Sequence, residues 1–175
     1  MNFHFKQWLT CLKHYILMCL FVSGPEHLPR SLHCIIISLL AYFLLGFSLV
    51  DQHRSYTMVV AQILLELGLL ALVAHIGLKW KKKLPRFHQT FSALLGINLI
   101  ITAVSIPVYQ VLMQNFSAGG EITQSVLNAT MVVIIWNLAV MSLIFKRAFE
   151  INTVLSSMIC FNYFLLYQFI IIWII

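Results

Sequence analysis

Five apolar stretches dominate this chain, and each is long enough for a helix to cross a lipid bilayer. A spanning helix needs about 20 predominantly apolar residues to cover roughly 30 Å of hydrocarbon. A water-soluble fold cannot bury so much continuous apolar surface. The sequence therefore predicts an all-α integral membrane protein with five transmembrane helices, at residues 33–50, 56–78, 90–113, 123–145 and 151–175.

The basic residues predict the direction in which these spans run. If the amino terminus lies in the cytoplasm, ten of the eleven Lys and Arg residues stay inside and only Arg54 lies outside, as the positive-inside rule requires. The carboxyl terminus is then outside. We interpret the inner residues between spans as topology signals or as contacts to lipid headgroups; they are Lys79, Lys81, Lys82, Lys83, Arg86, Lys146 and Arg147.

Residues 1–30 precede the spanning domain, residues 31–175, and have a different pattern. Phe5, Trp8, Leu9, Leu12, Ile16 and Cys19 recur at helical spacing, with Lys6, Thr10, Lys13 and His14 on the other side. This pattern predicts an amphipathic helix lying in the membrane interface, ended by Ser23-Gly24-Pro25. Two interpretations remain open: a helix that binds the membrane surface or a partner, and a lead-in that packs on its own bundle.

Composition excludes several classes of function. With 61% apolar and 9% charged residues, the chain has no spare soluble module. The net charge of +6 indicates topology and lipid contact, and we expect no nucleic-acid partner. Phosphate-binding, zinc-protease, hydrolase and dinucleotide motifs are missing, so we expect no enzyme. His33, His75 and His88 share one depth near the inner face, but we expect neither metal nor cofactor.

Glu66 is the most informative single residue, because it lies near the middle of the second span. An acidic side chain at that depth costs about 2.5–3.5 kcal/mol on insertion scales, so it needs polar partners. Gln62 lies one helical turn earlier on the same face. Depth within the other spans indicates three amide partners, which complete the predicted intramembrane cluster: Asn98, Asn137 and Asn162.

The layout resembles a known family. An amphipathic amino-terminal segment, the Ser23-Gly24-Pro25 break, five closely spaced spans and an outward carboxyl terminus with almost no tail are similar to the Yip family of five-span membrane proteins, including its compact bacterial members. The resemblance covers most of the chain and rests on layout. It implies a bacterial inner membrane. Eukaryotic members are associated with small GTPases and vesicle traffic, but their long soluble amino-terminal region is missing here, and no functional residue carries over.

These observations favour a non-enzymatic scaffold or accessory subunit of a membrane protein complex. Its partners would be the lipid bilayer and either another integral membrane protein or a second copy of the chain. The alternative is a small transporter or an ion-conducting component in which Glu66 takes up and releases a proton. A membrane enzyme acting on lipid is the third possibility, and it would need the histidines near the inner face.

Overall fold

The computed structural model describes residues 2–29, 31–48, 56–117 and 123–174, and its regular structure over these ranges is entirely helical, which confirms the all-α part of the predicted fold class. Short 3₁₀ turns at Pro25–His27 (η1) and Leu84–Arg86 (η2) lie between longer helices. The α-helices are α1 (Asn2–Cys19), α2 (Leu32–Ser48), α3 (Tyr56–Trp80), α4 (Phe87–Ser117), α5 (Gln124–Phe149) and α6 (Thr153–Ile174).

Four of these helices, α3 to α6, are long and apolar enough to cross a membrane. The 17 residues of α2 are apolar but rise only about 25 Å, and the predicted end of its span, residues 49–50, lies outside the described residues. The chain is therefore a multi-pass membrane protein by the length and composition of its helices.

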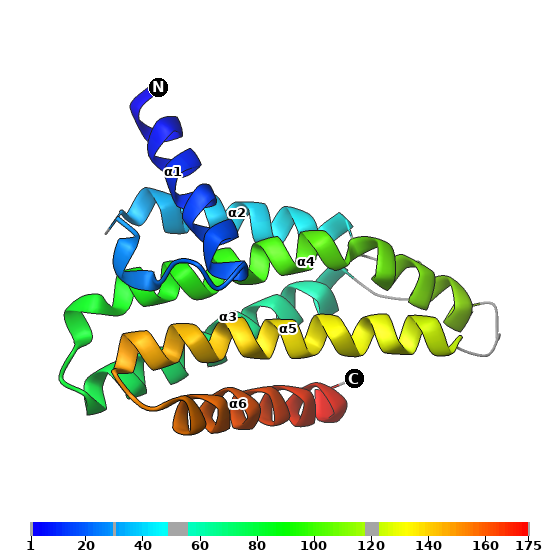
Figure 1. The fold of residues 1–175 in the computed structure, drawn as a ribbon. Coiled ribbons are helices and arrows are strands. Elements are labelled where there is room, and N and C mark those ends of the chain that lie inside the picture. Colours follow the sequence, from blue (N-terminus) through cyan, green and yellow to red (C-terminus); the bar gives the residue numbers. More distant parts are fainter. Residues whose placement is uncertain (1, 30, 49–55, 118–122, 175) are drawn as a thin grey trace.

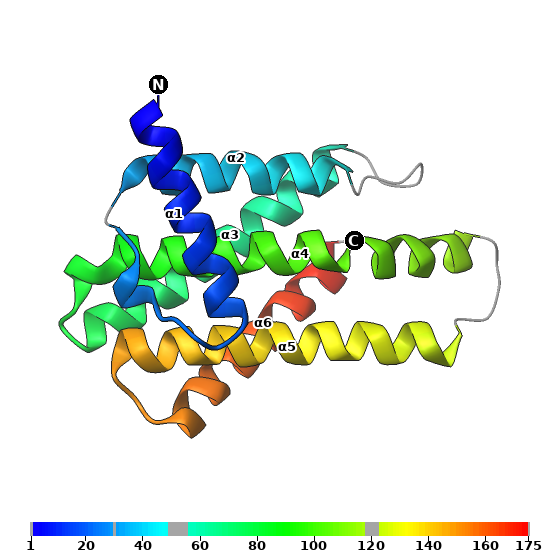
Figure 2. The same ribbon diagram turned by 45° about the horizontal axis from the view of Figure 1, so that its top comes forward.

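Helix α4 is at the centre of the bundle and packs against α1, α2, α3 and α5. In Figures 1 and 2, α2, α4 and α5 run lengthwise, and α1 lies across them. Helix α6 packs against α5 and α3. The carboxyl-terminal half of α4 bends (Figure 1), and Pro107 lies within that half. A proline removes one backbone hydrogen bond and clashes with the preceding turn, which accounts for a bend there.

Helix α1 packs on its own bundle through a face that includes only part of the predicted apolar stripe. Cys11, Tyr15 and Met18 are completely buried, whereas Leu9 and Ile16 of the predicted apolar stripe are exposed. Cys19 of the same stripe is 2% exposed and Leu12 packs against the core, so the stripe is divided between the bundle and the outer surface. Contact of its exposed residues with the membrane interface stays a prediction. The lipid and the interior of the bundle are both apolar. Hydropathy alone therefore cannot tell which apolar face of a helix contacts the lipid and which packs in the bundle.

Candidate functional site

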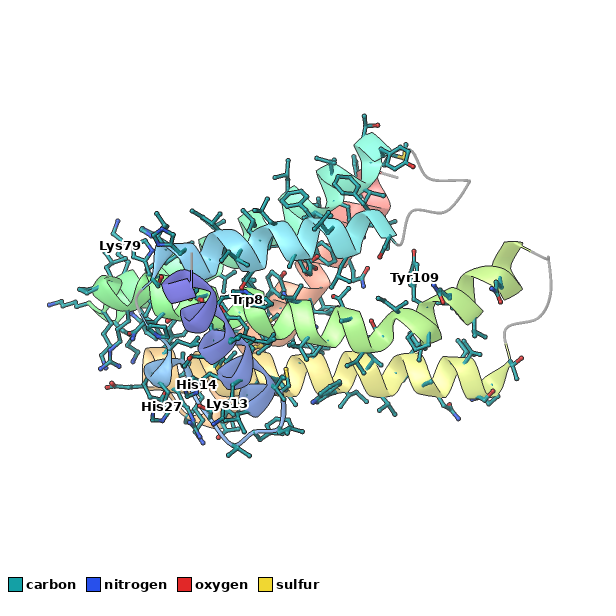
Figure 3. All side chains as sticks on the ribbon, turned by 90° about the horizontal axis from the view of Figure 1, so that it is seen from above. Trp8, Lys13, His14, His27, Lys79 and Tyr109 are labelled. Carbon is teal, nitrogen blue, oxygen red and sulfur yellow. The ribbon has the colours of Figure 1, made fainter. Side chains whose placement is uncertain are left out.

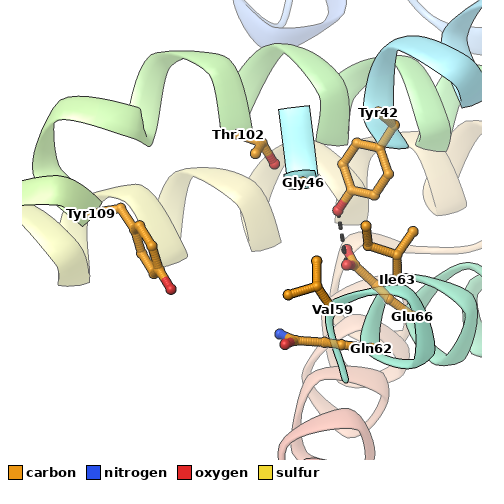
Figure 4. Close-up of a pocket in the computed structure, with 8 residues that line it drawn as sticks. All are labelled: Tyr42, Gly46, Val59, Gln62, Ile63, Glu66, Thr102 and Tyr109. Carbon is orange, nitrogen blue, oxygen red and sulfur yellow. Dashed lines mark hydrogen bonds between the residues drawn. The ribbon is translucent and has the colours of Figure 1, made fainter. Parts of the chain in front are cut away.

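The Glu66 carboxyl receives hydrogen bonds from two other helices. On α2, the Tyr42 hydroxyl donates to Oε2 at 2.8 Å, as Figure 4 shows. From α4, the Asn98 side-chain amide donates to Oε1 at 3.5 Å. The Asn137 amide on α5 donates in turn to Asn98 Oδ1 at 3.3 Å. Four helices thus contribute to one hydrogen-bond chain that ends at the carboxyl.

Burial explains why these polar side chains gather. Tyr42 and Asn98 are 7% and 2% exposed, respectively, and a buried polar group without a hydrogen-bond partner costs about 1–3 kcal/mol. Neighbours on the same faces, such as Ile63 and Leu67 on α3, are buried in the apolar core. Because these surroundings are largely apolar, the polar side chains there satisfy one another.

Helix α6 closes the cluster with two tyrosines that sequence reasoning missed. The Tyr163 hydroxyl donates to the Glu66 backbone carbonyl at 3.5 Å, and the Gln62 amide donates to the Tyr167 hydroxyl at 3.3 Å. The structure does not bring the predicted Asn162 into the cluster. Its side chain is exposed and its amide donates to the Met158 carbonyl of the same helix.

Glu66 lies on the walls of two cavities. The first, of about 180 Å³, is drawn in Figure 4 and extends from Glu66 past Gln62 and Thr102 toward Tyr109. It lies between the carboxyl half of α2, the amino half of α3 and the carboxyl half of α4. The second, of about 150 Å³, lies between α4, α5 and α6 and is also lined by Asn98 and Asn137. Both have room for water molecules, and polar walls favour water.

The direction of the hydrogen bonds determines what this site can do. Both carboxyl oxygens accept, and within the described chain no Lys or Arg pairs with them. Convergent donors are the environment that an ionised carboxylate requires, since it has no proton to donate. In a low-dielectric interior, such a carboxylate attracts a cation or a proton. The site is therefore suited to bind one of these from the adjoining cavities.

A second polar cluster attaches α1 to the bundle. The Tyr15 hydroxyl lies 2.7 Å from Ser92 Oγ on α4 and accepts a bond from Ser38 Oγ on α2 at 3.4 Å. Burial raises the pKa of Tyr15 to about 12. The Tyr15 ring lies on Gly96, where any Cβ would approach within 3.0 Å of ring atoms. Glycine at this position thus allows the aromatic ring to lie directly on the α4 backbone.

The end of α1 is attached to α5. The Trp136 indole donates to the Cys19 carbonyl at 2.9 Å. Trp136 lies near the middle of α5, about 20 Å along that helix from Phe149. The carboxyl end of α1 therefore packs against the middle of the bundle and not against its end.

The basic residues gather at the opposite end of the bundle from Tyr109. Figure 3 shows Lys79 at this end and Tyr109 in the other half of the molecule. In the turn after α5, Glu150 pairs with Lys83 and, at 3.1 Å, with Arg86. Lys83 and then Arg86 hold the pKa of the Glu150 carboxyl below its usual value. Of the remaining predicted residues, Lys81 lies over the Trp80 ring, Arg147 pairs with Glu26, and Lys79, Lys82 and Lys146 are exposed.

The three histidines considered as ligands do not form a metal-binding cluster. His33, His75 and His88 are exposed, and each belongs to a different helix. His75 and His88 both lie against the Phe87 ring. Over the residues that the structure describes, no three His, Cys, Asp or Glu side chains come close enough to hold a metal ion.

Comparison of the chain with protein-family models, with curated proteins and with solved structures gives no match. The function is therefore argued from the geometry of the chain's own residues.

Proposed function

We propose that this chain is a small transporter or ion-conducting component of a bacterial inner membrane, and that it binds a proton or a small cation at Glu66. The observation that carries this proposal is the convergence of hydrogen-bond donors on the Glu66 carboxyl at the wall between two cavities. The sequence favoured a scaffold, with Glu66 as an interhelical contact. The position of this carboxyl on the walls of two cavities favours the alternative.

A carboxylate at Glu66 must be balanced by a positive charge inside the bundle. Tyr42 and Asn98 bring a hydroxyl and an amide group to the two carboxyl oxygens, an arrangement that accommodates a carboxylate, which can only accept hydrogen bonds. A charged carboxylate in the membrane needs a counter-charge, because its solvation by protein dipoles is incomplete. A mobile cation or proton in the cavity supplies that counter-charge.

We also propose the orientation that the charge count predicts: five spans, with the amino terminus in the cytoplasm and the carboxyl terminus outside. The gathering of Lys79, Lys83 and Arg86 at one end supports it. In this orientation, the cavity that leads to Tyr109 lies in the outer half of the membrane, so that an ion would reach Glu66 from outside.

Flux in liposomes tests the proposal. Purified protein in vesicles should carry protons or Na⁺ down an imposed gradient, each measured separately with a dye inside the vesicle. Glu66→Gln should abolish the flux and leave folding intact, because glutamine keeps the shape but cannot change charge. Asn162→Leu is the matched control, since Asn162 lies in a span outside the cluster. Wild-type protein that is folded but carries neither ion would contradict the proposal.

A scaffold or accessory subunit is the second candidate, and one observation favours it. A groove of about 750 Å³ lies between α5 and α6, and its lining includes Ile135, Val154, Met158 and Phe161. A helix of another membrane protein, or of a second copy, would fit such an apolar groove. The resemblance to the Yip family belongs with this candidate. Purification in mild detergent would support it if a membrane protein co-migrates in a fixed stoichiometry.

A further inference from the structure

A third cavity lies at the basic end of the bundle, far from Glu66. It has a volume of about 200 Å³ and is lined by Pro25, Glu26, Arg86, Gln89, Thr90, Arg147 and Ala148. The lining comes from η1, η2, the first turn of α4 and the last turn of α5. Segments far apart in the sequence therefore meet around one polar space.

The charges around this cavity leave a positive excess. Two guanidinium groups, of Arg86 and Arg147, and one carboxylate, of Glu26, line it, and Glu26 accepts a bond from Arg147 at 3.0 Å. Arg86 also contacts Glu150, but Glu150 is shared with Lys83. The lining itself thus carries two positive groups and one negative group. The net charge is complementary to a single monoanion.

The backbone around the cavity favours an anion as well. Gln89 and Thr90 lie in the first turn of α4, where amide groups direct the positive end of the helix dipole outward. The Gln89 amide donates to the Leu28 carbonyl at 2.8 Å and thereby fixes η1 against α4. Arg86, Arg147 and Glu26 are 46%, 34% and 46% exposed, so an outside group can reach them.

We infer that this cavity binds the phosphodiester group of an anionic phospholipid. Arginine pairs phosphate through two parallel N–H···O bonds, and the last turn of a spanning helix lies at the depth of the headgroups. Bound in this way, the phosphate connects α4, α5 and η1. This site is independent of Glu66, and it would exist whether or not the chain carries ions.

Lipid retention in native mass spectrometry tests the site. Protein is equilibrated with mixed micelles that contain equal amounts of phosphatidylglycerol and phosphatidylcholine, and one phosphatidylglycerol should remain bound. The double variant Arg86→Gln, Arg147→Gln should bind phosphatidylglycerol at least about tenfold more weakly, because both guanidinium groups that would pair with the phosphate are lost. The control, Lys79→Gln with Lys81→Gln, removes the same charge outside the cavity and should retain the lipid as the wild type does.

Two further measurements separate the possible outcomes. Inorganic phosphate is added to the wild type, and the thermal unfolding temperature is recorded. A rise with phosphatidylglycerol alone identifies a lipid site, and an equal rise with phosphate identifies a site for the same group in soluble form. The proposal is overturned if the wild type has no preference for phosphatidylglycerol over phosphatidylcholine, or if the control variant loses as much lipid as the arginine variant. The preference of the wild type for phosphatidylglycerol over phosphatidylcholine tests the proposal even if the arginine variant does not fold.

Discussion

Gly96 marks the place where α1 comes closest to α4, and a single methyl group there should separate them. A Cβ at position 96 would lie within 3.0 Å of the Tyr15 ring, a separation that real Cβ atoms do not adopt. The ring cannot simply turn away, because it is fully buried and its hydroxyl is bonded to Ser92 and Ser38. Gly96→Ala should therefore force α1 outward.

Two opposing effects set the magnitude. Replacing a helical glycine by alanine stabilises a helix by about 1 kcal/mol, whereas overpacking a tight core costs about 1–3 kcal/mol. Gly68 on α3 supplies the reference, because a Cβ there meets no atom within 4 Å. Gly68→Ala should show only the gain. The free energy of unfolding of Gly96→Ala should then be lower than that of Gly68→Ala by about 1–3 kcal/mol.

Unfolding of both variants by sodium dodecyl sulfate in mixed micelles, followed by circular dichroism, measures this difference. Each variant should also be made with Tyr15→Ala. Once the ring is gone, the methyl group at position 96 has space, and the difference between the two alanine variants should vanish. Equal stabilities of Gly96→Ala and Gly68→Ala in the presence of Tyr15 would refute the described packing of α1.

Three other predictions concern topology, charge and pH. Cysteine labels at Lys82 and Ser117 in a cysteine-free background should react from opposite sides of the membrane; reaction of both from one side would contradict the orientation. Tyr42→Phe should lower the free energy of unfolding by about 1.5–3 kcal/mol, the range for a hydrogen bond to a charged group, and a loss near 0.5 kcal/mol would indicate a neutral carboxyl. The lowered pKa of Glu150 means that its pairing with Lys83 persists at neutral pH and is lost only as the pH falls through that lowered pKa. The protection factor of the amides in the turn after α5, which corrects the exchange rate for its intrinsic pH dependence, should then fall in acid, and this acid step should be missing in Glu150→Gln.

The sequence predicted the helices well because the physical signal is strong. An apolar run of this length has few alternatives to a spanning helix, and the described helices α3 to α6 begin within three residues of the predicted spans. The carboxyl ends differ more, since α4 and α5 continue four residues beyond the predicted spans, to Ser117 and Phe149. Phe87–Gln89 were predicted to lie outside the third span but form the first turn of α4, because a helix can continue into the headgroup region where water is available.

Only part of the intramembrane cluster could be predicted from the sequence. Depth alone indicated Asn98, Asn137 and Asn162, but depth does not fix the direction in which a side chain points around its helix. The structure has Asn98 and Asn137 in the cluster and Asn162 facing outward. Tyr42 was missed because a tyrosine in an apolar run looks like one more hydrophobic residue. Its spacing of one turn from Ser38, another buried polar residue, was the available signal.

The protonation state of Glu66 can be observed directly by infrared spectroscopy of the protein in lipid, because a protonated carboxyl and a carboxylate absorb at different frequencies. Subtracting the spectrum of Glu66→Gln from that of the wild type isolates this one group among the other acids. If Glu66 reversibly binds a proton or a cation, the difference spectrum should contain a carboxylate band. This band should shift when Na⁺ is added, or convert to a carboxyl band on acidification. A protonated carboxyl that stays unchanged over the whole accessible pH range, with and without Na⁺, would contradict an ion-binding Glu66 and would make it a structural contact between helices.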